Sequence, residues 1–281
     1  MNTQKNLETT SLPLLLSWLQ PVEFPHKLGI CERLFGHKLK TKGICWIQTG
    51  AGIPWKLDLS NPTHRWVIYG KYEGAAFINW AKSFLPSNGV VVDSGASIGQ
   101  MLLYLSQYVP TGKVLAFEPY PAAIEWLREC LDFHRRLPVE LISCGLGNEP
   151  GQVYLEDTGE ASGHGACSKV SRTANLGIPI QVTRLEDELL KRSISKVNLW
   201  CLDIEGYELP ALKGAESLLK QQSICALYIE LSDLTGGAGH KEAIQDFMAH
   251  FGYKAYQLNS ASQPYIPIKW SSHSNGLFLP Q

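Results

Sequence analysis

The turn at residues 93–99, Asp-Ser-Gly-Ala-Ser-Ile-Gly, constrains the fold of this chain more than any other part of its sequence. It follows the apolar run 90–92, which is typical of a strand buried on both faces. A stretch with helical spacing, 99–108, comes directly after it. Gly95 and Gly99 permit positive φ and a close approach of the backbone to a ligand. The sequence therefore predicts a ligand-binding turn between a buried strand and a helix.

Short apolar runs and longer helical patterns alternate from this turn to the C-terminus, which predicts an α/β fold. Further strands of the same sheet are expected at 114–117, 139–144, 197–202, 225–229, 253–258 and 276–279, and helices at 121–134, 185–191, 209–219 and 244–251. Two more strands are expected at 153–155, an edge strand within the otherwise irregular segment 147–178, and at 180–182. Strands joined by helices pair in parallel. The last two strands have no helix between them, so we expect them to pair antiparallel. Such a seven-stranded, mainly parallel sheet with an antiparallel terminal hairpin is similar to the Rossmann-like sheet of class I methyltransferases.

Acidic residues stand where the apolar strands of this sheet end. Asp93, Glu118, Asp203 and Glu230 each follow such a run, and Cys144 ends the remaining one. In an open parallel sheet, ligands bind at the carboxyl ends of the strands. The sequence therefore predicts a ligand site lined by carboxylates along this edge.

The spacing of the glycines and of Glu118 distinguishes between two cofactors. Glu118 lies 19 residues beyond Gly99, where a carboxylate accepts hydrogen bonds from a ribose diol. The nicotinamide fingerprint has a further glycine that lets the backbone approach a pyrophosphate, and the segment 95–99 lacks it. S-adenosylmethionine has the ribose and no pyrophosphate, so the sequence favours it over NAD.

Five segments together resemble the FkbM-type methyltransferases: 93–99, 116–119, 202–208, 212–215 and 275–279. The upstream segments 57–59 and 72–73 are similar to the lead-in of the same family. The resemblance extends from about residue 54 to the C-terminus, and the combination is more specific than any one motif.

This resemblance implies an S-adenosylmethionine-dependent O-methyltransferase that acts on hydroxyls of sugars, polyketides or other secondary metabolites. It implies that the turn with Asp93, Gly95 and Gly99 holds the methionine part of the cofactor, and that Glu118 holds its ribose. Tyr72 and Glu73 would close over it. The cofactor-binding residues that we expect are Tyr72, Glu73, Asp93, Gly95, Ala96, Gly99, Glu118, Pro119, Cys144 and Asp203.

A hydroxyl acceptor must lose its proton, which a nearby carboxylate or histidine can take. We expect Asp203 and Glu205, at the tip of a central strand, and His164, on the Gly- and Ser-rich segment 147–178, as catalytic residues. Alternatives stay open, because Glu205 also suits a helix N-terminus and His164 also suits an exposed loop. Carboxylates of Asp203, Glu205 and Glu230 would suit Mg²⁺, but no ligand spacing requires it, and no metal site is expected.

Charge and cysteine usage restrict the partners. The formal net charge is −1 and no basic stripe is present, which argues against nucleic acid as substrate and favours a small-molecule or glycan acceptor. The 7 cysteines contain no CxxC pair, which predicts a reducing, cytoplasmic location. The apolar run 12–19 is shorter than the ~20 residues of a membrane span, so a short helix is expected there. A homodimer is compatible with the sequence.

We expect residues 1–85 to form an N-terminal extension that packs on and caps the cofactor site, and residues 86–281 to form the methyltransferase domain. Two other functions remain alternatives. One is a nicotinamide-dependent oxidoreductase or epimerase on a Rossmann fold, and the other is a binding module that keeps the fold without catalysis.

Overall fold

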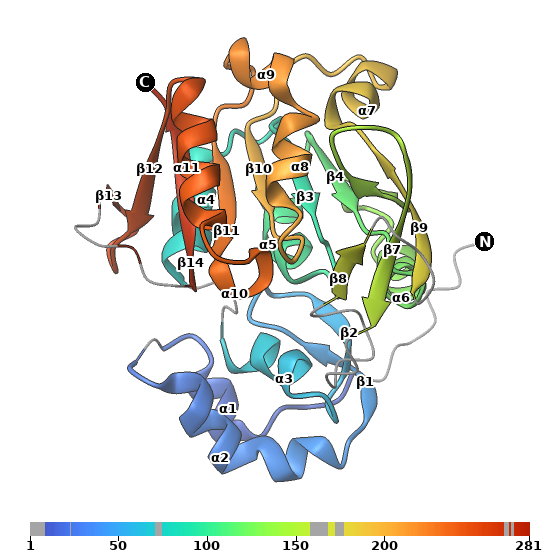
Figure 1. Ribbon diagram of the computed structural model, residues 1–281. Coiled ribbons are helices and arrows are strands. Elements are labelled where there is room, and N and C mark those ends of the chain that lie inside the picture. Colours follow the sequence, from blue (N-terminus) through green and yellow to red (C-terminus); the bar gives the residue numbers. More distant parts are fainter. Residues whose placement is uncertain are drawn as a thin grey trace.

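The structure, a computed structural model, describes residues 9–22, 24–70, 75–157, 168–171, 177–266, 270 and 273–281. Its centre is an eight-stranded sheet in the order β13-β12-β14-β11-β10-β3-β4-β5 (Figure 1). The strands are β3 (Val90–Ser94), β4 (Lys113–Phe117), β5 (Val139–Ile142), β10 (Leu199–Leu202), β11 (Leu227–Ser232), β12 (Tyr253–Leu258), β13 (Pro264–Tyr265) and β14 (His273–Pro280).

The pairing of these strands confirms the class I methyltransferase fold. The five strands from β5 to β11 are parallel, and β14 lies antiparallel between β11 and β12. The last strand is thus inside the sheet, where Leu277 and Phe278 are fully buried in the apolar layers of opposite faces. The predicted seven strands are present, and the two-residue β13 adds an eighth at the edge.

Helices cover both faces of the sheet. In Figure 1, α8 (Glu208–Lys213) and α11 (His240–His250) lie in front of it, and α4 (Ala75–Phe84) and α5 (Gln100–Tyr108) lie behind it. The remaining helices beside the sheet are α6 (Pro121–Phe133), α7 (Leu185–Lys191), α9 (Glu216–Lys220) and the short α10 (Asp233–Gly236). Alternate residues of a strand pack into the apolar layers on opposite faces of the sheet, since Val91 belongs to one apolar cluster and Val92 to the other.

The single helix predicted around 209–219 is two helices, α8 and α9. Between them lies Gly214, and a Cβ atom at this position would be 2.0 Å from the carbonyl oxygen of Gly147. The chain therefore breaks the helix where it passes the backbone of the neighbouring loop.

A second, four-stranded sheet replaces much of the irregular segment predicted at 147–178. Its order is β6-β9-β7-β8, with β6 (Gly145–Leu146), β7 (Gly151–Asp157), β8 (Ser168–Ser171) and β9 (Ile178–Thr183). The predicted strand at 153–155 belongs to β7. Val153, Leu155, Ile180 and Val182 form a small apolar cluster on one face of this sheet.

The N-terminal region forms a layer below the sheet in Figure 1. It contains α1 (Leu14–Leu19), α2 (Lys27–Lys40), the antiparallel hairpin of β1 (Ile44–Gln48) and β2 (Pro54–Asp58), and α3 (Pro62–Tyr69). Arg65 of α3 is 4% exposed and makes two hydrogen bonds with Glu32 of α2, at 2.6 and 2.9 Å. Tyr69 donates a third to the same carboxylate at 2.8 Å. These partly buried hydrogen bonds connect the two helices.

Trp55 of β2 connects the hairpin to the turn at 93–99. Its ring is fully buried, and its Nε1–H donates to the carbonyl oxygen of Ile98 at 2.7 Å. A Cβ atom at position 99 would be 2.5 Å from the ring, so only a glycine leaves room for it. Next to it, Trp126 of α6 donates to the carbonyl oxygen of Lys56 at 3.1 Å. The hairpin is thus hydrogen-bonded to both the turn and α6, and it supports the turn.

We expect Trp55→Phe to lower the free energy of unfolding by about 1–3 kcal/mol, because the buried carbonyl of Ile98 loses its donor. Urea denaturation measures the change. Trp18→Phe is the matched control, because Trp18 is 78% exposed and its replacement should change stability by less than about 0.5 kcal/mol. Equal stability of wild type and Trp55→Phe would show that this hydrogen bond contributes nothing.

Candidate active site

A pocket lies at the carboxyl ends of the central parallel strands, between the main sheet and the second sheet. One wall consists of the turn after β3 and the ends of β4, β10 and β11. The other wall is apolar and consists of Leu146 together with Val153, Leu155, Ile180 and Val182 of the small sheet. The pocket is therefore polar on one side and hydrophobic on the other.

The turn after β3 is held between two neighbouring strands. Gly95 has φ +82°, and a Cβ atom there would be 1.9 Å from the carbonyl oxygen of Asp203 at the end of β10. On the other side, the N–H groups of Gly95 and Ala96 donate to the carbonyl oxygen of Phe117 at 3.0 and 3.1 Å. Glycine at 95 is required for both the conformation and the space.

Glu118 is the most firmly fixed carboxylate of the pocket. One of its oxygens accepts from the N–H of Ser97 at 2.7 Å and the other from the N–H of Tyr120 at 2.8 Å. The residue is 5% exposed, and burial raises the pKa of its carboxyl to about 7, although the two N–H groups act to lower it. A carboxylate oxygen has about two acceptor positions, so each oxygen keeps one for a ligand.

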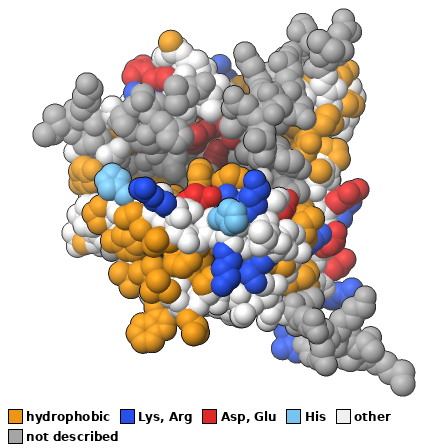
Figure 2. Space-filling view, turned by 90° about the horizontal axis from the view of Figure 1, so that it is seen from below, with side chains coloured by type: hydrophobic (Ala, Val, Ile, Leu, Met, Phe, Trp, Pro, Cys, Tyr) orange, Lys and Arg blue, Asp and Glu red, His pale blue; other side chains and the backbone are white. Residues whose placement is uncertain are grey.

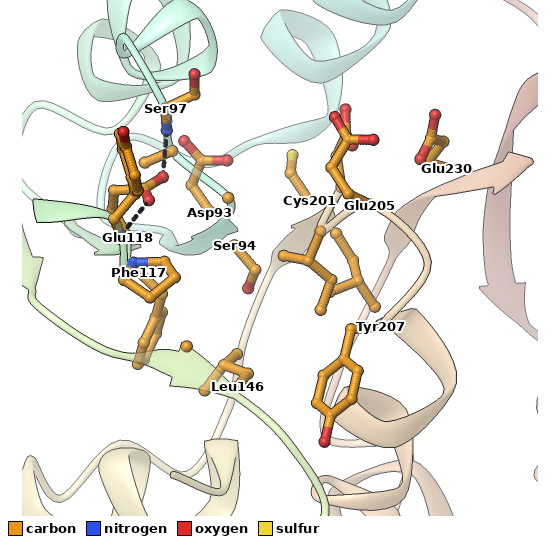
Figure 3. Close-up of a pocket in the computed structure, with 18 of the residues that line it drawn as sticks. Asp93, Ser94, Ser97, Phe117, Glu118, Leu146, Cys201, Glu205, Tyr207 and Glu230 are labelled. Atoms are coloured by element: carbon orange, nitrogen blue, oxygen red, sulfur yellow. Dashed lines mark hydrogen bonds between the residues drawn. The ribbon is translucent and has the colours of Figure 1, made fainter. Parts of the chain in front are cut away.

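Four carboxylates follow the order of the strands along the polar wall. Figure 3 shows Glu118 after β4, Asp93 in β3, Glu205 after β10 and Glu230 in β11 from one side of the pocket to the other. Asp93 is 3% exposed, and its neighbour Ser94 accepts a hydrogen bond from Nε1 of Trp200 at 2.8 Å. Asp203, the acid predicted at the end of β10, lines the pocket together with Glu205, so the four predicted strand-end acids all border it.

The turn after β10 presents Asp203 and Glu205 to the pocket. Asp203 is exposed, and its N–H donates to the carbonyl oxygen of Ser94 at 3.2 Å. Glu205 has φ +56°, a left-handed conformation that is uncommon outside glycine and is found at functional turns. The backbone of this turn is thus both tied to β3 and strained.

Glu208 holds the turn in that conformation. Its side chain is completely buried, and one carboxylate oxygen accepts from the N–H groups of Ile204 and Gly206 at 2.9 and 3.1 Å. The other oxygen lies 2.8 Å from Nε2 of His240 at the start of α11. This hydrogen bond raises the pKa of His240, assisted by the charges of Glu208, Asp233 and Glu230 and opposed by burial. The sequence does not indicate this contact, because the two residues are 32 positions apart in the chain.

The predicted site residues fall into three groups. Those that line the pocket are Asp93, Gly95, Ala96, Glu118, Pro119, Asp203 and Glu205. Gly99 and Cys144 are not among the lining residues: Gly99 packs against Trp55, and half-buried Cys144 packs beside the apolar layer of α7 and α8. Gly145 and Leu146 form the wall beside it instead. Tyr72, Glu73 and His164 lie outside the described residues.

The sequence did not indicate several other lining residues. Thr63, Tyr207, Tyr228 and Asn275 come from four separate parts of the chain. Tyr207 and Asn275 lie in the segments 202–208 and 275–279 that carry the family resemblance, but nothing in the sequence marks either side chain as part of the site. In Figure 3 the ring of Tyr207 points away from the four carboxylates. The apolar wall had a detectable signal, because Val153 and Leu155, like Ile180 and Val182, alternate with the period of a strand.

This pocket fits S-adenosylmethionine. The turn at Gly95 gives the close backbone approach that the amino-acid end of the cofactor requires, and Glu118 has a free acceptor position on each oxygen for the two ribose hydroxyls. Leu146 and the apolar wall suit a flat adenine ring. Within the described ranges, no three His, Cys, Asp or Glu side chains form a group that could hold a metal ion.

Comparison with known proteins identifies the domain. The family described as Methyltransferase FkbM domain matches residues 93–255, which is more than half of the chain. Methyltransferase 1 of Beauveria bassiana (strain ARSEF 2860) is 27% identical over 149 residues, covering 47% of this chain and 60% of that protein. Methyltransferase sdnD of Sordaria araneosa is 28% identical over 161 residues, covering 47% and 62%. The match favours S-adenosylmethionine over the nicotinamide alternative.

The chain spans about three fifths of the length of these curated relatives. Among solved structures, it is similar to Aeropyrum pernix fibrillarin in complex with natively bound S-adenosyl-L-methionine. The sequence identity is 11%, the similarity covers 73% of each chain, and the TM-score is 0.42.

We expect the affinity for S-adenosylhomocysteine to depend on pH through Glu118. Ribose hydroxyls donate to the carboxylate, so binding weakens as the pH falls through the raised pKa of about 7. Between pH 8 and pH 6 the Kd measured by calorimetry should rise ~10-fold, because about a tenth of the carboxyl remains ionised at pH 6.

Glu118→Gln in the same buffers is the control for titration of the ligand. It should bind at least ~10-fold more weakly at pH 8 and lose the pH dependence, since its amide places an NH2 against a backbone N–H. A variant that binds like wild type would contradict the assignment.

The His240–Glu208 pair should make stability depend on pH. The pKa of His240 is raised in the folded protein, so the pair stabilises fully below the unfolded pKa of about 6.5, and this contribution is lost as the pH rises through the higher folded value. The difference in Tm between wild type and His240→Gln should therefore be larger at pH 5.5, about one unit below the unfolded pKa, than at pH 8.5, about two units above it. His250→Gln, an exposed histidine at the end of the same helix, should give no such trend. A difference that grows with pH would mean that neutral His240 is the stabilising form.

Proposed function

Because the chain belongs to the FkbM family of S-adenosylmethionine-dependent methyltransferases, we propose that it methylates a hydroxyl of a sugar, polyketide or other small secondary metabolite. The observation that carries this proposal is the contact between the turn after β3 and the end of β10. Because Gly95 lies against the carbonyl oxygen of Asp203, a cofactor held by the turn lies beside the carboxylates of Asp203 and Glu205.

In this proposal, different residues of the chain bind the ribose and the amino-acid end of the cofactor. Bound S-adenosylmethionine supplies an electrophilic methyl group. Glu118 holds the ribose, and the backbone at Asp93, Gly95 and Ala96 holds the amino-acid end. With the cofactor held at both ends, its methyl group would be available for in-line attack by a bound acceptor oxygen, and positioning of this kind supplies much of the rate of a displacement.

Asp203 is the proposed base for the acceptor hydroxyl, and Glu205 is its companion. An ionised carboxylate within hydrogen-bond reach of a hydroxyl can accept its proton as the bond to the methyl carbon forms. Asp203 is exposed to the pocket on a backbone that is fixed to β3, and Glu205 is kept in its strained conformation by Glu208. His164, which lies outside the described residues, remains a second proposed base.

The polar side chains near Glu230 support a small acceptor that carries hydroxyl groups. Asn275 of β14 is the register partner of Glu230, and Tyr228 lies two residues before it in β11. We further propose that residues 1–85 cap this site as an extension of the domain 86–281. Thr63 of α3, which lines the pocket, supports that role.

Transfer of a labelled methyl group from S-adenosylmethionine to a panel of hydroxylated sugars and polyketides tests the proposal. With an accepted substrate, Asp203→Asn should lower kcat by ~100-fold or more, as expected for loss of a general base. The Kd for S-adenosylhomocysteine should stay within about threefold, because Glu118 and the β3 turn are intact. Glu205→Gln should lower kcat by a smaller factor.

Asp246→Asn is the charge-matched control, because Asp246 is exposed on α11 and does not line the pocket. Its kcat should equal that of wild type. Full activity of Asp203→Asn would exclude Asp203 as the base. Transfer to amines and to no hydroxyl would show that the acceptor atom is nitrogen.

A further inference from the structure

Helices α1 and α2 expose more apolar surface than their place in the fold explains. The side chains of Leu14, Leu15, Trp18 and Val22 are 83%, 59%, 78% and 50% exposed, and those of Ile30 and Leu34 are 43% and 60% exposed. We call these six residues the α1–α2 face. Figure 2, which views the molecule from below, shows hydrophobic side chains gathered on this side with Lys, Arg and His side chains beside them.

The packing of the two helices does not need this face. Leu16 of α1 and Cys31 and Leu39 of α2 are fully buried in the main apolar cluster, and Phe35 is 8% exposed there. Each helix therefore already has an inner apolar side. Single exposed leucines are normal in proteins, but several on adjoining helices mark an interaction surface.

Among the residues that the structure describes, the charged side chains beside the α1–α2 face are mainly positive. Arg33, His37, Lys38, Lys40 and Lys42 are all exposed along the second half of α2 and just after it. The carboxylate of Glu32, which lies among them, is engaged by Arg65 and Tyr69. The whole chain has a net charge of −1, so this is a local positive cluster that complements an anionic partner.

We propose that the α1–α2 face binds the surface of an anionic lipid bilayer. Apolar residues with an aromatic ring on one side and Lys and Arg at the edge are the pattern of a helix that lies in the membrane interface. Leu14, Leu15 and Trp18 enter the headgroup region, and Lys38 and Lys40 contact lipid phosphates. No helix in the described part of the chain is long and apolar enough to cross a membrane.

A second copy of the chain fits this face less well. A twofold contact places the same surface of both copies together. The basic residues from Arg33 to Lys42 would then face an identical cluster, and like charges at an interface oppose association. An anionic surface satisfies both the apolar and the charged parts of the face.

Flotation of the full chain with lipid vesicles tests the proposal. We expect binding to phosphatidylcholine vesicles that contain phosphatidylserine, at least ~10-fold weaker binding to pure phosphatidylcholine, and weakening of the former by salt. The double variant Leu14→Ser, Trp18→Ser should reduce binding by ~10-fold or more. Its matched control is Leu190→Ser, because Leu190 is 80% exposed on α7 at the other end of the molecule (Figure 1).

Charge variants separate the electrostatic part. Lys38→Gln with Lys40→Gln should remove most of the preference for phosphatidylserine, whereas Lys213→Gln with Lys220→Gln, at exposed positions of α8 and α9, should leave it unchanged. Thermal denaturation shows that each variant is folded, as expected for exposed positions.

Three results would overturn the proposal. The first is no binding of wild type to either kind of vesicle. The second is equal binding by the Leu14→Ser, Trp18→Ser variant. The third is a dimer in sedimentation velocity that this variant dissociates while neither protein binds vesicles, which would assign the face to a second copy.

Discussion

The pocket depends on the contact of Gly95 with the carbonyl oxygen of Asp203, a place where the chain has no room for a side chain. This contact brings the turn after β3 against the end of β10, and the hydrogen bonds to Phe117 bring the same turn against β4. Three strand ends therefore meet at one point. The side chains that leave them, Asp93, Glu118 and Asp203, line one pocket as a result.

Buried polar contacts support both sides of this meeting point from a distance. Trp55, in the N-terminal hairpin, donates to the turn after β3, and Glu208, paired with His240, accepts from the turn after β10. Each of these side chains forms hydrogen bonds with backbone groups of a turn, and these groups lie outside the regular hydrogen bonding of helices and strands. Since buried polar groups of this kind are costly to leave without partners, they fix the conformation of the two turns rather than only adding stability. The turn after β3 and the turn after β10 thus each have their own supporting side chain.

Local periodicity explains which parts of the fold could be predicted. Buried strands such as Val90–Ser94 and the acid at each strand end leave a signal within a few residues, and the antiparallel end of the sheet followed from the missing helix. The split between α8 and α9 and the bond from Trp55 to Ile98 left none, because each depends on a segment far away in the sequence. The small sheet was missed for a similar reason, since the pairing of β6 with β9 joins short strands across an intervening segment without strong periodicity.

The same distinction applies to the site. Glu118 was predictable because it follows a strand at a fixed interval from a glycine turn, whereas Tyr228 and Asn275 reach the pocket only through the order of the strands.

The central claim is that Glu118 receives the ribose of S-adenosylmethionine. A crystal structure of the protein with S-adenosylhomocysteine tests it most directly. We predict both ribose hydroxyls within about 2.5–3.0 Å of the Glu118 carboxylate oxygens. A nucleoside bound elsewhere, or a ribose that does not touch Glu118, would contradict this account.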